Sequence, residues 1–224
     1  MDSARAATAA RGVHRMDWLR RYLQPTRPSL EEIRRYFEEA ARDEEHYPAT
    51  IDPRIYHVKL VLEHLGDLSG RRVADVGCGK GRFARVLQER SPDAKICAID
   101  LAASMLHHVP AGIDRCMASM TALPLATASC DGAYATESLE HAVDIPKAVG
   151  ELCRIVKPGG RIVIIDKNKK KWGKLDTPRW EKWFGRNELE KLLGTHCSHV
   201  ESREISYWED VEPDGLFLAW LAVK

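Results

Sequence analysis

The sequence predicts an α/β protein built around a doubly wound, mostly parallel sheet. From about residue 55, short apolar runs alternate with helical patterns, as in sheets made of strand–helix–strand units. The run 73–76 leads into a turn with glycines at alternate positions, and a helical pattern follows that turn. The run 161–165 reads as one continuous apolar strand, which is typical of strands covered on both faces. Two final apolar runs predict an antiparallel C-terminal hairpin at the sheet edge.

Two helices are predicted before the sheet. Ser29 and Glu32 have the spacing of a capping box, and apolar residues recur at helical spacing after them, which predicts a helix over 29–43. A second helical pattern covers 55–66 and ends near a glycine. We therefore expect residues 1–54 to form an N-terminal helical arm or cap over the site. The main domain should span 55–224, with a lid segment near 167–186.

The remaining elements are bounded by capping and turn residues. Asp144 and Pro146 are suited to begin a helix, and Asn187 is predicted to cap another helix with Glu190 as its box partner. Asp214-Gly215 is a residue pair typical of turns and predicts a turn before the last strand. The predicted strands are 72–76, 95–100, 113–117, 132–136, 161–165, 200–208 and 216–223, and the predicted helices after 66 are 81–90, 103–108, one from 146 and one from 187.

The composition is that of a globular protein with balanced charge. Of 224 residues, 34 are Lys or Arg, 33 are Asp or Glu, and 44% are hydrophobic. This balance gives no reason to expect bulk nucleic-acid binding, and no apolar run has the length of a membrane span. The six cysteines lack metal-ligand spacing, so we interpret them as reduced, mostly buried thiols of a cytoplasmic protein. The first residues are basic, but Asp2 and Asp17 favour a simple arm over a transit peptide.

The glycine turn and two acidic residues near it are predicted to bind a ligand. Asp75 lies two positions before Gly77, and Gly79 and Gly81 complete a GxGxG pattern. Glycines allow a sharp turn and let a ligand approach the backbone, while the following helix presents free N–H groups. Asp75 favours a cationic ligand group. Asp100, at the end of the next strand, is placed to bind ribose hydroxyls.

With these motifs the chain resembles the class I S-adenosylmethionine-dependent methyltransferases, in particular the type 11 and ubiquinone-pathway enzymes, over about residues 55–166. The resemblance implies a Rossmann-like sheet of seven strands and S-adenosyl-L-methionine as cofactor. The glycine segment would hold the methionine part, Asp100 the ribose hydroxyls and the segment 118–124 the adenine. The cofactor-binding residues that it implies are Asp75, Gly77, Cys78, Gly79, Gly81, Asp100, Leu101, Ser119, Met120 and Glu137.

A polar cluster follows the predicted strand 132–136, at the carboxyl end where open α/β sheets place their sites. Glu137, Glu140 and His141 match the E-x-x-E-H pattern of the ubiquinone-pathway O-methyltransferases and the small-RNA 2′-O-methyltransferases. That resemblance implies a divalent metal, Mg²⁺ or Mn²⁺, which holds hydroxyl oxygens of the acceptor. Two alternatives stay open, namely His141 as a general base without metal, and the glutamates as ordinary carboxylates at a helix start.

A basic, tryptophan-rich segment follows the strand 161–165. Its first residues lie nearest to the strand end and are the best candidates for substrate contact, while the consecutive lysines after them favour a solvated loop. The predicted substrate-binding residues are Lys167, Asn168, Trp172, Tyr36 and Trp180. Phe37, Tyr47, Trp183 and Phe184 are further aromatic residues that could roof an aromatic substrate.

Together these patterns favour a methyltransferase that acts on an oxygen or nitrogen of a small metabolite. An aromatic or anionic metabolite is the acceptor that the neighbouring residues favour. An RNA methyltransferase is the alternative that the lysines support, and a non-catalytic cofactor-binding relative is another. A nicotinamide oxidoreductase is disfavoured, because the pattern is GxGxG and not GxGxxG. We expect a small-molecule acceptor, no nucleic acid, no membrane span, and a monomer or homodimer.

Overall fold

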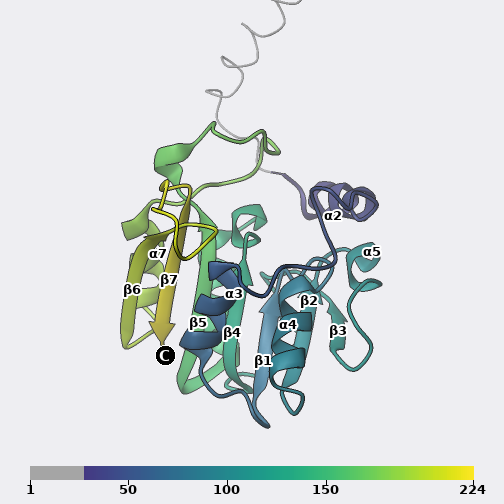
Figure 1. Cartoon of the computed structure of the whole chain (residues 1–224), viewed down its shortest axis with the longest axis vertical. Coiled ribbons are helices and arrows are strands. Elements are labelled where there is room, and N and C mark those ends of the chain that lie inside the picture. Colours follow the sequence, from purple (N-terminus) through teal and green to yellow (C-terminus); the bar gives the residue numbers. More distant parts are fainter. Residues whose placement is uncertain (1–27) are drawn as a thin grey trace, which may run out of the picture.

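A computed structural model describes residues 28–224, and it confirms the predicted fold class. Seven strands form one sheet in the order β3-β2-β1-β4-β5-β7-β6 (Figure 1). All pairs among β1 to β5 are parallel, whereas β7 runs antiparallel to both β5 and β6. The strands are β1 (Arg72–Val76), β2 (Lys95–Asp100), β3 (Asp114–Met117), β4 (Cys130–Thr136), β5 (Val156–Lys167), β6 (His199–Ile205) and β7 (Phe217–Val223).

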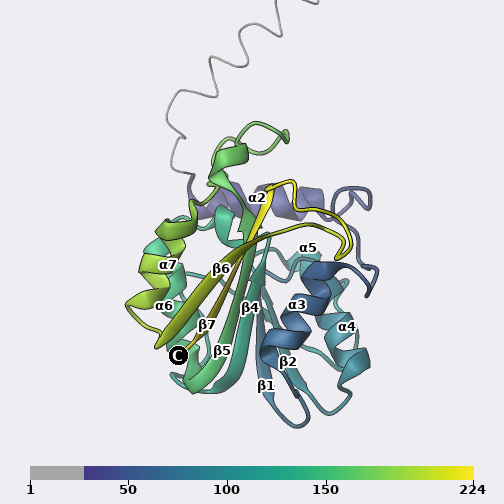
Figure 2. The ribbon, with the colours of Figure 1, turned by 60° about the vertical axis from the view of Figure 1, so that its left-hand side comes forward.

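Helices cover both faces of the sheet. Figure 2 shows α3 and α4 on one face and α6 and α7 on the other. In β7, Ala219 and Leu221 pack with the first pair of helices, while Leu218 and Trp220 pack with the second pair. Because successive strand residues point to opposite faces, one apolar run fills both cores. The helices are α2 (Leu30–Ala40), α3 (Tyr56–Leu65), α4 (Arg82–Arg90), α5 (Ala103–Leu106), α6 (Ile145–Ile155) and α7 (Arg186–Gly194), with short 3₁₀ helices η1 (Leu139–His141) and η2 (Lys169–Lys171).

Two of the predicted helix starts are confirmed by their hydrogen bonds. The Ser29 side chain accepts from the Glu32 backbone N–H, and the Glu32 carboxylate accepts from the Ser29 backbone N–H, as in a capping box. The Asp144 side chain caps α6 by accepting from the backbone N–H of Lys147. The first helix ends at Ala40 rather than near residue 43. The predicted arm over residues 1–27 lies outside the described residues.

The prediction for the start of α7 is wrong. Gly185, not Asn187, is the N-cap of this helix, and no side chain caps it. The Glu190 carboxylate accepts a hydrogen bond from the Ser202 hydroxyl of β6 instead of returning to the helix start. A contact with the neighbouring strand therefore replaces the local capping box.

The cysteines are free thiols, as predicted. Cys78, Cys130 and Cys153 are buried, and the other three are half-buried. Across residues 28–224, no helix combines the length and the apolar character that a membrane crossing requires.

The N-terminal part of the described chain lies over the carboxyl ends of the parallel strands. Both ribbon views show α2 across this end of the sheet, next to α5 (Figures 1 and 2). The Glu38 carboxylate of α2 accepts from the backbone N–H groups of Ala103 and Ser104, each at 2.9 Å. These bonds satisfy free N–H groups at the start of α5 and tie the two helices together.

Candidate active site

A cavity of about 740 Å³ lies at the carboxyl ends of the parallel strands. Residues that follow β1, β2 and β4 line it from below, and α2 and the segment 167–186, which we predicted to be a lid and refer to as the lid segment, line it from above. From β1 the chain adds β2 and β3 on one side of the sheet and then adds β4 and β5 on the other side, so the strand order reverses between β1 and β4. Open α/β sheets bind ligands at such points. The volume falls within the range of about 300–1,000 Å³ that is typical of small-molecule sites.

The glycine turn after β1 requires glycine for two different reasons. Gly77, Gly79 and Gly81 all have positive φ angles, between 53° and 76°. A Cβ at Gly77 would lie 2.4 Å from the Cβ of Ser138, and one at Gly81 would lie 2.9 Å from Cγ2 of Val109. A Cβ at Gly79 would meet nothing within 4 Å, and Gly79 lines the cavity. The turn therefore packs tightly at its two ends and leaves open space for a ligand at its centre.

Asp100 lies at the end of β2 and faces the same cavity. Its Oδ2 accepts from the Gly79 backbone N–H at 2.8 Å, and its Oδ1 accepts from the Ala102 backbone N–H at 2.9 Å. Burial raises the pKa of this carboxyl, and the backbone N–H donors act in the opposite direction. These bonds fix the carboxylate beside the glycine turn, where a ligand with hydroxyl groups would meet it.

The other predicted cofactor residues also line the cavity, with one exception. Cys78, Leu101, Ser119 and Met120 all contribute to its wall. The Ser119 hydroxyl lies 2.8 Å from the Thr121 hydroxyl, so one of its hydrogen-bonding positions is already used. The structure thus brings the glycine turn, the end of β2 and the segment after β3 into one site.

The exception is Asp75, whose side chain does not reach the cavity. It is 1% exposed and lies within β1 beside Tyr134 of β4. Burial raises its pKa to about 7, and the neighbouring Tyr134 hydroxyl lowers it. The prediction that this side chain contacts a cationic ligand group is therefore not met in this structure. Asp75 lies behind the turn rather than on its ligand side.

Glu137 lines the cavity but stands apart from the other members of the predicted E-x-x-E-H set. It has a positive φ of 51°, and its Oε1 accepts from Arg82 at 3.0 Å. The same oxygen lies 4.0 Å from Nδ1 of the buried His57. Glu137 is thus directed toward the start of α4, on the side of the cavity that the glycine turn borders.

Glu140 and His141 belong to a second, buried group that includes two residues of the lid segment. The Lys167 ammonium contacts Glu140 and lies 3.3 Å from Oε1 of Glu181. The Nε2 atom of His141 lies 3.6 Å from Glu140 and 3.9 Å from Glu181. Trp183 donates its ring N–H to Glu181 at 2.6 Å. We refer to Glu140, His141, Asp166, Lys167 and Glu181 as the Lys167 cluster.

Burial perturbs every charge of the Lys167 cluster. It raises the pKa of Glu140 well above its usual range, and Asp166 adds to this effect. It raises the pKa of Glu181 to about 7, with a further contribution from Glu140. Burial lowers the pKa of His141 to about 3, so this ring is neutral near pH 7. Burial alone would lower the pKa of Lys167, but the surrounding carboxylates raise it.

The predicted metal set of Glu137, Glu140 and His141 is not assembled. Among the described residues, the side chains that come within ligand distance of one another are Glu140, His141 and Glu181. Lys167 already supplies a positive charge to both glutamates of that group. These residues therefore do not fit a divalent ion in the arrangement seen here, because the ion and the ammonium would compete for the same carboxylates.

Aromatic side chains form the wall beside the Lys167 cluster. The rings of Tyr36, Phe37 and Tyr47 line the cavity, and the Phe37 ring lies edge-on to the His141 ring at 4.9 Å. Trp180 does not line the cavity, but its ring packs edge-on against Tyr36 at 5.2 Å. Two of the predicted aromatic roof residues are instead part of the interior, namely Trp183 and Phe184.

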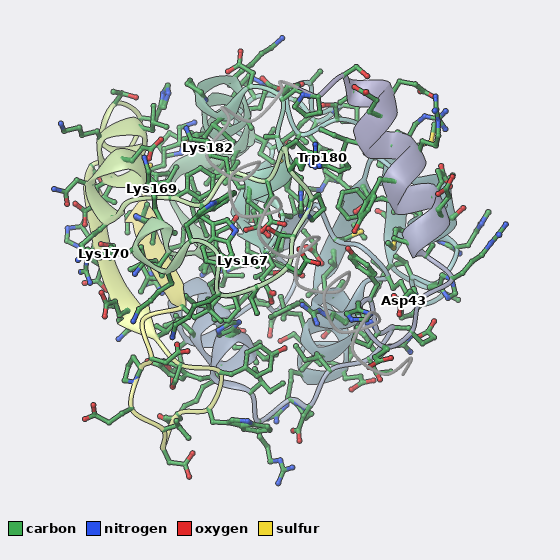
Figure 3. All side chains as sticks on the ribbon, turned by 90° about the horizontal axis from the view of Figure 1, so that it is seen from above. Asp43, Lys167, Lys169, Lys170, Trp180 and Lys182 are labelled. Carbon is green, nitrogen blue, oxygen red and sulfur yellow. The ribbon has the colours of Figure 1, made fainter. Side chains whose placement is uncertain are left out.

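The other predicted substrate contacts lie outside the cavity. Asn168 is buried, donates to the Gly215 carbonyl at 2.9 Å and caps η2, so it has a structural role. Trp172 is 43% exposed and packs against Trp183. Figure 3 shows Lys167 near the middle of this end of the molecule and Lys169 and Lys170 at its periphery. The consecutive lysines thus fit the alternative of a solvated loop.

Several charged residues of the site were missed by the sequence interpretation, and three of them form ion pairs within the site. Glu181, Lys80 and Arg82 all line the cavity. Lys80 and Arg82 could have been identified from the sequence, because they lie within and directly after the GxGxG turn. Glu181 could not, since it is far along the chain from the other members of its cluster and lies in no regular element.

Comparison with known proteins agrees with this geometry. A family model described as a methyltransferase domain matches residues 74–164. The malonyl-(acyl-carrier protein) O-methyltransferase of Pectobacterium atrosepticum is 30% identical over 155 residues, which cover 64% of this chain and 60% of that protein. The ubiquinone biosynthesis O-methyltransferase of Idiomarina loihiensis is 36% identical over 123 residues, which cover 50% of this chain and 49% of that protein. The chain thus spans between about half and 60% of these relatives.

Solved structures share the fold at low sequence identity. A geranyl diphosphate methyltransferase in complex with sinefungin has a TM-score of 0.68 at 15% identity, with 88% of this chain and 99% of that chain covered. The cyclase SpnF has a TM-score of 0.71 at 16% identity, with 88% of this chain and 96% of that chain covered. The matched domain and the curated relatives support a methyltransferase domain of the S-adenosylmethionine-dependent class over residues 74–164, and the solved structures show the fold.

Proposed function

We propose that the protein transfers a methyl group from S-adenosylmethionine to an oxygen or nitrogen of a small molecule. The observation that carries this proposal is a single cavity with two chemically different halves. One half has the open glycine turn and the Asp100 carboxylate, and the other has the aromatic wall and the Lys167 cluster. Curated relatives that match the domain are named as O-methyltransferases, which supports the same reaction class.

The residues of the first half fit S-adenosylmethionine. The space in front of Gly79 and the N-terminus of α4 suit the methionine part, because free backbone N–H groups bind a carboxylate. Asp100 is the group that would hold the ribose hydroxyls. Met105, Ala118 and Met120 offer apolar surface to the adenine ring. When bound, S-adenosylmethionine supplies an electrophilic methyl group on a sulfonium sulfur.

The second half supplies positioning and a proton acceptor. Methyl transfer is an in-line displacement, so much of the rate comes from aligning the acceptor with the methyl carbon. Glu140 and Glu181 are buried in this half. Glu181, with a pKa near 7, is matched to take a proton at neutral pH, whereas His141 with its pKa near 3 is a weaker base.

We further propose that residues 28–54 act as a cap on the main domain. Glu38 ties α2 to α5, and Glu44 contacts the ammonium of Lys80 in the glycine turn. The aromatic residues of the acceptor half come from this cap, as Tyr36, Phe37 and Tyr47. The cap therefore contributes to both halves of the cavity.

Direct titration tests the proposed function. S-adenosylmethionine is titrated into the full chain by calorimetry, and S-adenosylhomocysteine release is then measured with a panel of small hydroxyl, carboxylate and amine acceptors. We expect saturable binding that S-adenosylhomocysteine competes for, and turnover with at least one acceptor. Absence of cofactor binding would overturn the proposal. A parallel titration with NAD⁺ is expected to give no binding.

A further inference from the structure

The charges that line the cavity are unbalanced. Among the described residues that line it, six carboxyl groups face three Lys and Arg side chains. The carboxyl groups are those of Asp43, Asp100, Glu137, Glu140, Asp176 and Glu181, and the cations are Lys80, Arg82 and Lys167. Each of these cations already binds glutamate, which is Glu44 for Lys80, Glu137 for Arg82, and Glu140 with Glu181 for Lys167. An anionic acceptor would have to draw a cation away from a protein carboxylate, whereas a cationic acceptor would not.

The imbalance is sharpest in the Lys167 cluster. Three buried carboxyl groups, Glu140, Asp166 and Glu181, surround the single ammonium of Lys167. Glu140 lines the cavity, and its carboxyl interacts with that of Asp166, which raises the pKa of Glu140 further. The cluster therefore holds more carboxyl groups than positively charged groups.

The wall beside the cluster suits the same kind of group. Phe37 packs against His141, and Tyr47 lies 6.0 Å from Phe37, so aromatic rings continue from the cluster up to the cap. His141 is neutral near pH 7 and adds no positive charge. Aromatic rings attract cations through their electron-rich faces. A cation at this end of the cavity would have carboxylates on one side and rings on the other.

We propose, on the basis of the methyltransferase function proposed above, that the acceptor is a small organic amine that binds as its ammonium cation between Glu140, Glu181 and the aromatic rings. The Glu181 carboxylate takes a proton from the ammonium group. The freed electron pair on nitrogen then forms the bond to the methyl carbon while the carbon–sulfur bond breaks. The electrons of that bond stay on sulfur, which becomes a neutral thioether. Nitrogen, rather than oxygen, is thus the atom that is methylated.

Three probes of the same size and different charge test this proposal. Benzylamine, benzyl alcohol and benzoate are titrated by calorimetry into the full chain saturated with S-adenosylhomocysteine. The same titrations are made with Glu181→Gln and with Glu188→Gln as the matched control. Glu188 belongs to α7, binds Lys182 at 2.6 Å and does not line the cavity. Affinity for S-adenosylhomocysteine reports whether each variant is folded.

We expect benzylamine to bind at least about tenfold more tightly than benzoate in the unaltered protein. Glu181→Gln should weaken benzylamine about tenfold and leave benzyl alcohol unchanged, because only the charged probe loses its partner. Glu188→Gln should change neither affinity. If S-adenosylhomocysteine binds but benzoate equals benzylamine, or benzylamine does not bind, the inference falls while the proposed function stands. If S-adenosylhomocysteine itself fails to bind, the proposed function falls and takes this inference with it.

Discussion

Lys80 of the glycine turn and Glu44 of the loop after α2 form an ion pair between two parts of the chain that meet only in the folded protein. The Lys80 side chain is 1% exposed, whereas that of Glu44 is 60% exposed. The Lys80 ammonium also lies 3.4 Å from the Asp43 backbone oxygen. Because a buried cation depends strongly on its few partners, this pair is a direct link between the cap and the turn that borders the cofactor half.

The first prediction concerns that link. Glu44→Gln removes the charge partner of Lys80 and should loosen the cap, so the affinity for S-adenosylhomocysteine should fall by up to about tenfold. Calorimetry measures the affinity, and limited proteolysis of the loop after α2 measures the loosening. Glu45→Gln, at an exposed neighbouring position, is the control. Equal affinities for both variants would contradict a role for the pair.

The second prediction concerns Asp100. Asp100→Asn keeps the shape of the side chain but replaces a carboxylate that would accept from ribose hydroxyls, so cofactor affinity should fall by about tenfold to a hundredfold. Asp114→Asn, at an exposed position in the adjacent strand β3, should leave affinity unchanged. An Asp100→Asn protein that binds S-adenosylhomocysteine normally would show that the carboxylate does not hold the cofactor.

The third prediction separates the two roles of the glycine turn. Gly77→Ala places a Cβ against Ser138 and should cost roughly 3 kcal/mol of unfolding free energy, from overpacking and positive φ together. Gly79→Ala meets open space, so its cost should be only about 1 kcal/mol, from its positive φ. Its larger effect should be on cofactor affinity. Urea unfolding and calorimetry of both variants measure the two quantities, and the reverse order of stabilities would refute the assignment.

The fourth prediction concerns the pH dependence of methyl transfer. Glu181 accepts a proton only when ionised, so kcat/KM should rise with pH through about 7, the pKa to which burial raises this carboxyl. The titratable groups that face it are Glu140, Lys167 and His141, and none of these has its usual pKa. Glu181→Gln should lower the plateau and remove this limb of the profile. A profile that keeps the same limb would assign the titration to another group.

The fifth prediction concerns His57, which is fully buried between Tyr207 and Phe217 with both ring nitrogens unpartnered. Burial lowers its pKa from 6.5 to about 4, while Glu137 acts against this effect and Arg82 adds to it. The unfolded chain takes up this proton first, so stability is lost as pH falls from about 6.5 to about 4.

Below about pH 4, the depressed pKa of His57 lowers the free energy of unfolding by about 3 kcal/mol. His57→Phe should therefore flatten the loss of unfolding free energy in this pH window, as measured by urea unfolding at a series of pH values. His107→Phe, at an exposed histidine, is the control. An unchanged slope for His57→Phe would show that His57 does not carry the acid sensitivity.

Patterns within short stretches of the chain were enough to predict the sheet and most of the residues that line the glycine-turn side of the cavity. The order of strands and helices follows from period and length, and the Gly77 to Gly81 turn with Asp100 lies within one strand–helix–strand unit. Capping by Ser29 and Asp144 was predictable for the same reason, since each cap acts on N–H groups two or three residues away.

The acceptor half was decided by the tertiary structure. Glu137, Glu140 and His141 are close in sequence, but the positive φ of Glu137 directs it toward Arg82 and away from the other two. Glu181 joins Glu140 only because the lid segment folds back over the end of β5. A contact between distant segments also explains why Gly185, and not Asn187, is the N-cap of α7. Glu190 accepts a hydrogen bond from Ser202 of the neighbouring strand β6 instead of completing a capping box.

The amino-acid sequence by itself therefore determined the fold class, the glycine turn and the acidic residue that serves it, because these depend on backbone conformation and near neighbours. Only the tertiary structure decided which charges face one another across the cavity. Those pairings depend on where distant segments meet, and burial at that point then sets the pKa values of Glu181 and His141.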